Sequence, residues 1–154
     1  MTNPYLIESP ALISFSGGRT SGYLLRRIID AFGGRLPPDV LPCFANTGKE
    51  MPETLDFVRD CGERWDVAIV WLEYNPALPE KFERVSPATA SRKGEPFERL
   101  LVNRGMLPNP VTRFCTSELL CGRPHNNSCV GPLVMWRPVT SFNEIGVSPA
   151  GSTT

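Results

Sequence analysis

The sequence predicts an α/β fold in which helices flank a parallel sheet, and three observations support this prediction. Short apolar segments alternate along the first half of the chain with segments whose apolar residues recur at helical spacing. Glycine and proline residues mark the connections between these segments. Consecutive strands separated by helices are joined by right-handed crossovers, so neighbouring strands run parallel. A chain of 154 residues also has the length of one domain.

The first half of the chain is expected to contain two strands, each followed by a helix. Residues 11–15 form the first predicted strand, and a glycine-rich turn follows it directly. A helix is then expected from Gly22 to the glycine pair that begins at Gly33. A proline-marked turn precedes the second predicted strand, residues 40–45. Pro52 stands where a first helical turn would begin, so it is expected to open the second helix.

The chain up to residue 120 continues with a third strand and then with less regular structure. The third predicted strand comprises residues 67–74, which are almost all apolar. Residues 75–94 contain several prolines and are expected to form a long loop. A short helix is predicted over residues 95–104, and another helix is expected to begin at Thr116.

Residues 121–154 are predicted to form a divergent, loosely structured tail. Glycine and proline are scattered there, and helical periodicity is absent. The segment PLVMW could add one strand, but no further strand is recognisable, so the first strand is expected to have an under-protected edge. A shifted reading frame or a truncation after about residue 120 would explain the change in composition. The charged residues of the tail are Arg123, Arg137 and Glu144.

The composition argues against several classes of partner. Lys+Arg and Asp+Glu both number 16, so a chain-wide attraction to nucleic acid or to an anionic membrane is not indicated. No basic region followed by a long apolar run opens the chain, and no apolar stretch has the length of a membrane span. An odd number of cysteines without an export signal predicts reduced thiols in the cytoplasm. The cysteines are Cys43, Cys61, Cys115, Cys121 and Cys129.

The turn after the first strand has the residues of an anion site. A strand that turns sharply into a helix leaves the free N–H groups of the helix at the carboxyl end of the sheet. Glycines there permit unusual backbone angles and close approach of phosphate oxygens, while hydroxyl and guanidinium groups add donors. The alternative is a tight strand-to-helix turn capped by serine. The residues are Ser16, Gly17, Gly18, Arg19, Thr20 and Ser21.

Three motifs resemble those of one protein family. The segment SGGRTS, residues 16–21, is similar to the S-G-G-x-x-S loop of the PP-loop superfamily, the adenine nucleotide alpha hydrolases. FANTGKEMPETLDFV, residues 44–58, resembles the second signature of the phosphoadenosine phosphosulfate (PAPS) reductase family. TRFCTSEL, residues 112–119, resembles its third signature. The motifs stand in the order of the family. The resemblance implies a Rossmann-like fold and a nucleotide-binding domain over residues 1–120.

The resemblance also implies a ligand and a site. An adenine nucleotide, whether ATP, adenylyl sulfate or PAPS, would place a phosphate or sulfate in the loop of residues 16–21, and Mg²⁺ could accompany it. Arg113 would reach the anion from the other side; alternatively it is a surface charge. A reductase would in addition need a thiol reductant protein. The residues expected near the adenosine or the reacting phosphate are Asn46, Thr47, Gly48 and Glu50, for which the alternative is a turn that caps the second helix.

The chain departs from the family at two places. ATP pyrophosphatases of the superfamily usually carry Asp where this chain has Thr20, so a Mg²⁺ ligand is missing. PAPS reductases attack with a cysteine in a Glu-Cys-Gly-Leu-His context, which this sequence lacks. Two functions therefore stay open: sulfuryl or adenylyl transfer, and nucleotide binding without catalysis in a truncated remnant.

A zinc site is a weaker third interpretation. The spacing C-x5-C-x3-H-x3-C differs from the usual C-x2-C arrangement of zinc-binding cysteines, so neither zinc nor an iron–sulfur cluster is expected. The residues concerned are Cys115, Cys121, His125 and Cys129.

Overall fold

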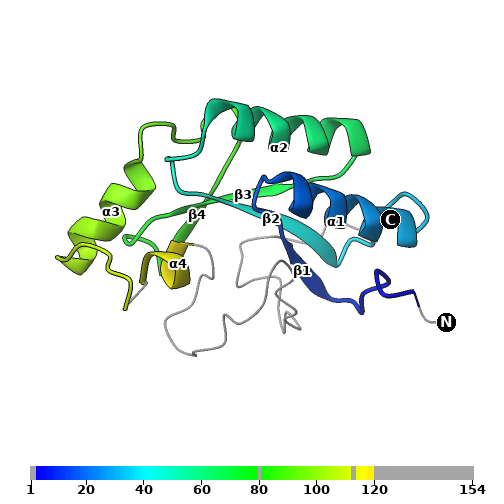
Figure 1. Cartoon of the computed structure of the whole chain (residues 1–154), viewed down its shortest axis with the longest axis horizontal. Helices are drawn as coiled ribbons and strands as arrows, with labels where there is room; N and C mark the ends of the chain where they lie inside the picture. Colours follow the sequence, from blue (N-terminus) through cyan, green and yellow to red (C-terminus); the bar gives the residue numbers. More distant parts are fainter. Residues whose placement is uncertain (1–2, 80, 112–113, 120–154) are drawn as a thin grey trace, which may run out of the picture.

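A computed structural model describes residues 3–79, 81–111 and 114–119 of the chain. Within them, four strands and four helices follow one another along the sequence (Figure 1). The predicted tail, residues 121–154, lies outside the described residues. The elements are β1 (Ala11–Ser14), α1 (Arg19–Ala31), β2 (Val40–Asn46), α2 (Pro52–Trp65), β3 (Val70–Tyr74), β4 (Phe82–Val85), α3 (Glu95–Arg104) and α4 (Phe114–Leu119).

The sheet has the strand order β1-β2-β3-β4 and is mixed. β1, β2 and β3 are parallel, with Ala11 opposite Val40 and Cys43 opposite Val70. β4 pairs antiparallel with β3. The α/β class and the parallel first three strands are therefore confirmed. Among the described residues β1 lies at one end of the sheet. Whether residues 121–154 leave this edge under-protected, as predicted, lies outside the described residues.

The prediction of a loop over residues 75–94 and of a wholly parallel sheet was wrong, because β4 lies within that segment. The chain reverses after β3: the Asn75 N–H donates to the Lys81 carbonyl at 2.9 Å, and the Lys81 N–H donates to the Leu78 carbonyl at 3.0 Å. A tight reversal returns the chain beside the strand it has just left, and such neighbours pair antiparallel.

Helices α1 and α2 cover one face of the sheet (Figure 1). Two consecutive right-handed crossovers in the same direction place both helices on that face. Phe15, Phe44 and Val58 are buried between the sheet and the helices. A Cβ on Gly22 of α1 would lie 3.0 Å from Cζ of Phe57 on α2, so the two helices pack closely at this point.

Helices α3 and α4 pack around the end of β3. Tyr74 is buried there in a second apolar cluster with Leu100, Phe114 and Leu119. The Tyr74 hydroxyl accepts a hydrogen bond from Nδ2 of Asn103 at 3.0 Å. The helix predicted over residues 95–104 is confirmed at both ends, and the helix expected to begin at Thr116 begins two residues earlier.

β1 and β2 end within one residue of the predictions, whereas α1 and β3 begin at other residues than predicted. α1 begins at Arg19 instead of Gly22, because Gly18 already serves as its N-cap. β3 begins at Val70 instead of residue 67, because the end of α2 extends this far: Asp66 adopts a left-handed conformation, and the Val67 N–H donates to the Gly62 carbonyl at 3.0 Å.

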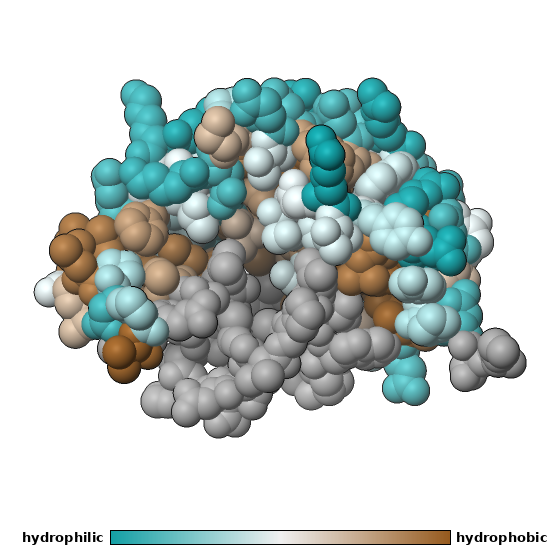
Figure 2. All heavy atoms as spheres, in the orientation of Figure 1, coloured by the Kyte–Doolittle hydropathy of each residue, from teal (hydrophilic) through white to brown (hydrophobic). Residues whose placement is uncertain are grey.

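The surface is chemically uneven. Figure 2 shows hydrophilic side chains over α2 and a gathering of hydrophobic ones at the end of the molecule where α3 lies. Val102, Met106 and Leu107 contribute exposed apolar surface in this part of the chain. Within the described ranges, no helix has both the length and the apolar character needed to cross a bilayer.

Candidate functional site

Two loops that carry predicted site residues lie at the same edge of the sheet. The glycine loop, residues 16–21, follows β1, and the second loop, residues 46–50, follows β2. Because β1 and β2 are parallel, their carboxyl ends share one edge, which is where α/β proteins bind ligands. The structure thus brings the first two motifs together.

The glycine loop presents the positive end of α1. Gly18 is the N-cap in an extended conformation, with φ of −88° and ψ of 161°, and no side chain caps the helix. The first N–H groups of a helix have no intrahelical partner and carry partial positive charge. No acidic residue stands in the first turn of α1, and Ser16, Arg19 and Thr20 are exposed around it. The arrangement favours an anion.

The two glycines of this loop serve different purposes. Gly17 has a φ of +74°, and a Cβ there would lie 2.7 Å from Cγ2 of Thr54 and 3.0 Å from Cγ2 of Val58, both on α2. Glycine is therefore required at this position by packing against α2. A Cβ on Gly18 would meet only the hydroxyl oxygens of Ser16 and Ser21, at 3.7 and 4.0 Å. A side chain would therefore find space at Gly18 but not at Gly17.

Two serines fasten the glycine loop to the first turn of α1. The Ser16 hydroxyl donates to Oγ of Ser21 at 3.0 Å, and the Ser21 hydroxyl donates to the Gly18 carbonyl at 2.9 Å. Ser21 is buried, whereas Ser16 is exposed. Ser21 therefore shapes the loop from inside, and Ser16 is the serine of the pair that faces solvent.

Asn46 opens the second loop, but its polar atoms are used within the protein. Its side chain is 2% exposed. Its Nδ2 donates to Oε1 of Glu73 at 2.7 Å and to the Ser91 carbonyl at 2.8 Å, and its Oδ1 accepts from the Gly48 N–H at 3.0 Å. Both amide hydrogens thus have partners. Asn46 therefore shapes the second loop through these contacts, and its predicted place near the nucleotide stays a prediction.

Thr47 and Glu50 form a short polar bridge across the second loop. The Thr47 hydroxyl donates to Oε1 of Glu50 at 3.0 Å and accepts from the Lys49 N–H at 3.2 Å. Thr47 and Glu50 are half-buried, and Lys49 is exposed. This turn directly precedes α2, whose N-cap is Met51 and which receives no side-chain capping hydrogen bond. Part of the Thr47 and Glu50 side chains stays accessible.

Glu73 and Ser91 were not identified from the sequence. Glu73 is 2% exposed and lies at the end of β3, directly opposite Asn46. Its Oε1 accepts from the Ser91 N–H at 2.6 Å as well as from Asn46, and its Oε2 accepts from the Ser91 hydroxyl at 2.7 Å. A carboxylate within the otherwise apolar strand VWLEY was the available signal, because buried charges occur where partners await them.

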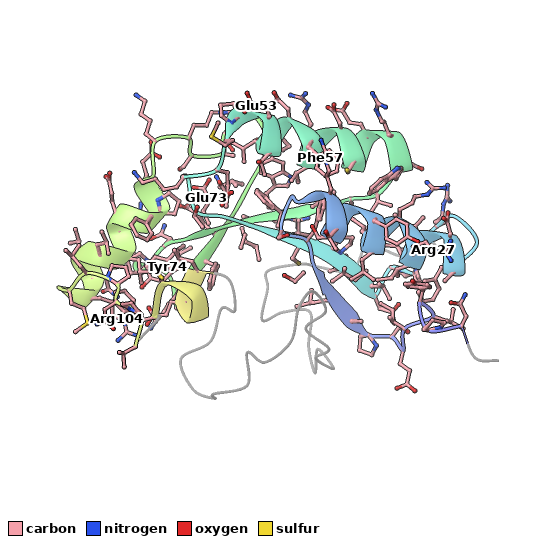
Figure 3. The ribbon with its side chains drawn as sticks, viewed as in Figure 1. Arg27, Glu53, Phe57, Glu73, Tyr74 and Arg104 are labelled. Atoms are coloured by element: carbon pink, nitrogen blue, oxygen red, sulfur yellow. The ribbon has the colours of Figure 1, made fainter. Side chains whose placement is uncertain are left out.

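Ser91 belongs to a third loop, residues 86–94, which contacts the second loop backbone to backbone. Gly48 and Gly94 both have positive φ, of +75° and +98°. A Cβ on Gly48 would lie 2.9 Å from Cα and N of Gly94. Nζ of Lys49 donates to the Lys93 carbonyl at 3.2 Å. Figure 3 shows Glu73 near the segments that lead into α2 and α3.

The third motif is described only in part. Arg113 lies outside the described residues, so its predicted reach toward the anion stays a prediction. In α4, Glu118 is buried and forms an ion pair with Arg104, whose guanidinium lies 5.9 Å from the ring centre of Phe114.

No group of three or more histidine, cysteine, aspartate or glutamate side chains could hold a metal ion within the described residues. Cys121, His125 and Cys129 of the zinc interpretation lie outside them. Cys43, Cys61 and Cys115 are free thiols. Burial raises the pKa of the Cys43 thiol to about 12, so this cysteine stays protonated and unreactive at neutral pH.

Comparison with known proteins found a relative in a bacteriophage. The chain is similar to an uncharacterized nin region protein, ORF290, of Escherichia phage lambda, with 41% identity over 115 residues. The match covers 70% of this chain and 39% of the phage protein, so the chain spans well under half of that relative. No family model and no solved structure matches the sequence.

Proposed function

We propose that this chain binds an adenine nucleotide and belongs to the PAPS reductase family, with the Rossmann-like fold of the adenine nucleotide alpha hydrolases. It would take ATP, adenylyl sulfate or PAPS as substrate for sulfuryl or adenylyl transfer. Two arguments support the proposal: the three motifs in family order, and the position of the first two at one edge of the sheet.

The observation that carries the proposal is the geometry of the glycine loop. Gly18 leads an extended backbone straight into α1, with free space where its side chain would be and no acid in the first helical turn. A phosphate or sulfate placed there would accept hydrogen bonds from the N–H groups of α1 and from Arg19. Aligned donors of this kind stabilise the charge that develops when a phosphoryl or sulfuryl group is transferred.

The second loop would complete the site by shape and by a few polar groups. Gly48 holds the backbone turn, and Thr47 and Glu50 keep accessible surface toward the edge of the sheet. Asn46 supports this loop from the interior. In this proposal the glycine loop binds the anion, and the second loop recognises the rest of the nucleotide.

The two loops do not fit a tightly held Mg²⁺ ion. Glu50 carries their only carboxylate, and its Oε1 already accepts from Thr47. Thr20, where related pyrophosphatases carry Asp, offers a neutral hydroxyl. Mg²⁺ prefers six oxygen ligands in near-octahedral geometry, usually including carboxylates. Nucleotide binding through the glycine loop therefore depends on N–H, hydroxyl and guanidinium donors.

A catalytically inactive nucleotide-binding protein is the second candidate function. The observation that favours it is the absence from the sequence of the reductase cysteine motif, to which a thiol reductant protein would be coupled. Such a protein would bind PAPS or ATP and release it unchanged. Product analysis by mass spectrometry, with and without a dithiol reductant, distinguishes it from a transferase.

Thermal unfolding of the full chain with each nucleotide tests the proposal. A ligand present at 100 times its Kd adds about 2.7 kcal/mol to the free energy of unfolding. We expect a clear rise in Tm with one or more of ATP, adenylyl sulfate, PAPS and 3′,5′-ADP, and none with adenosine at equal concentration. If no nucleotide raises the Tm at millimolar concentration, the proposed function is wrong.

A further inference from the structure

We infer that Glu73 is a positioning residue that clamps the second and third loops into a single rigid wall of the nucleotide site. The role in ligand binding rests on the proposed function, but the clamp itself does not. None of the three motifs contains Glu73, and its partner Ser91 lies 18 positions further along the chain.

The carboxylate lies where the two loops converge. Glu73 is the last but one residue of β3 and lies on the face toward α1 and α2, beside Asn46 at the end of β2. The next residue, Tyr74, belongs to the apolar cluster of α3 and α4 on the opposite face (Figure 3). The alternation of the strand thus directs Glu73 to the loops while Tyr74 anchors the strand behind it.

One arm of the clamp sets the orientation of the Asn46 amide. A carboxylate can only accept hydrogen bonds, so Nδ2 of Asn46 must face Oε1 of Glu73. Oδ1 is then left to accept the Gly48 N–H. That hydrogen bond is the side-chain-to-backbone bond of an Asx-turn, which fixes the backbone just before the left-handed Gly48. Glu73 therefore determines the shape of the second loop through Asn46.

The other arm fixes the third loop. Both the N–H and the hydroxyl of Ser91 donate to the carboxylate, one to each oxygen. Three residues later Gly94 lies against Gly48, where a Cβ would come within 2.9 Å of Cα and N of Gly94. The third loop is thus held at both ends of a short segment, by the charge of Glu73 and by contact with the second loop.

The cost of the arrangement indicates a specific purpose. A buried carboxylate loses hydration, and only full hydrogen bonding compensates for this loss. Two apolar side chains would hold two loops together at a lower cost, but they would not orient an amide or a hydroxyl. The buried acceptor oxygens are therefore explained by the loop geometry that they impose.

The experiment compares Glu73→Ala with Glu73→Gln in the full chain, by hydrogen exchange and by nucleotide affinity. Glutamine keeps an acceptor oxygen for Asn46 and for the Ser91 N–H, while its NH₂ group can donate to the Ser91 hydroxyl. We expect Glu73→Ala to speed exchange of the Gly48 and Ser91 amides, and to weaken ATP or PAPS binding, each by about tenfold or more. Glu73→Gln should stay within about threefold of the wild type in both.

Glu83→Ala is the matched control. Glu83 is the register partner of Glu73 on β4, and its carboxylate pairs with Arg99 of α3 instead of with a residue of either loop. It should change neither readout, and amides of α1 and α2 should exchange at wild-type rates in every variant. If Glu73→Ala does not fold, Ser91→Ala replaces it, with faster exchange expected in the third loop and little change in the core.

Unchanged exchange at Gly48 and Ser91 in a folded Glu73→Ala protein would overturn the clamp. Faster exchange with unchanged affinity would show that the clamp exists but does not serve the nucleotide, which overturns the inference. If the wild-type chain binds neither ATP nor PAPS, the proposed function fails, and the inferred role in binding fails with it. The exchange data would still decide whether Glu73 holds the loops.

Discussion

The glycine loop and the second loop end neighbouring parallel strands, yet they are built in opposite ways. The glycine loop is held by two local hydrogen bonds between serines and its own backbone, and most of its polar groups are exposed. The second loop begins with a buried Asn46, whose hydrogen bonds cross 27 and 45 positions of sequence. The glycine loop thus exposes hydrogen-bond donors, whereas the buried contacts of the second loop fix the shape of this edge of the sheet.

The contrast between the two loops shows that the motif residues shared with the PAPS reductase family do not all have the same role. Motif residues at the second loop would naturally be assigned to the ligand, but Asn46 points inward and Gly48 contacts the third loop. Motif residues at the glycine loop divide in the same way, with Gly17 against α2 and Gly18 open. A motif therefore contains both residues proposed to bind the ligand and residues that stabilise the loop, and their contacts within the protein tell the two kinds apart.

The largest expected effect is a loss of stability when Gly17, the buried glycine of the glycine loop, is replaced. Gly17→Val would force a side chain into Thr54 and Val58 and a β-branched residue into a left-handed conformation. We expect a loss of about 3 kcal/mol or more from the free energy of unfolding in urea. The control, Gly18→Ala, should lose about 1 kcal/mol or less. Equal losses would mean that the loop does not pack on α2.

Removing the amide of the second loop should cost slightly less. Asn46→Ala would leave the Glu73 carboxylate with an unfilled acceptor and free the Gly48 N–H. A buried group deprived of its partner costs about 2 kcal/mol, and more when it is charged. Ser16→Ala on the exposed glycine loop should cost about 0.5 kcal/mol in the same urea experiment. A larger loss for Ser16→Ala would reverse the proposed roles of the two loops.

Nucleotide affinity, unlike stability, should depend more on the exposed glycine loop than on the buried second loop. Arg19→Ala should weaken ATP about tenfold by calorimetry, because a charge-assisted hydrogen bond is lost, while the free energy of unfolding stays within about 0.5 kcal/mol. Arg35→Ala is the control, since Arg35 is 86% exposed and lies beyond the other end of α1. Equal affinities for the two variants would exclude Arg19 from the site.

The smallest expected effect is a gain in the free energy of unfolding. Thr20→Asp would place a carboxylate in the first turn of α1, where no acid now stands. Interaction with the helix dipole should add about 0.5 kcal/mol to the free energy of unfolding. ATP should bind more weakly without Mg²⁺, because like charges meet, and should regain affinity when Mg²⁺ is added. If the substitution leaves ATP binding unaffected in either buffer, the phosphates do not lie at this turn.

Much of the fold could be predicted because its signals are local. Gly94 and Gly105 bound α3 on either side, and a proline at the first position of α2 fixes where that helix begins. Alternating helical and apolar segments gave β1, β2 and β3 and their parallel order. β4 escaped prediction because it has four residues in a proline-rich segment, and only pairing with β3 makes it a strand.

The site could be predicted less fully, for a related reason. The glycine loop is contiguous, so its residues and their chemistry are visible in the sequence. The hydrogen bonds that hold the second loop depend on Glu73 and Ser91, which none of the three motifs contains. These residues come together only after β2 and β3 have paired. The space that distinguishes Gly17 from Gly18 is likewise set by α2, which begins 35 positions after Gly17.

The central claim is that the glycine loop binds the anionic part of a nucleotide and that the second loop supports its shape. Titration of the ¹⁵N-labelled full chain with ATP and with PAPS, followed by amide chemical shifts, tests it most directly. We expect saturable shifts that are largest at the backbone amides of Gly18, Arg19 and Thr20, with the Asn46 side-chain amide nearly unmoved. Shifts confined to other surfaces, or no saturable shift at millimolar nucleotide, would contradict it.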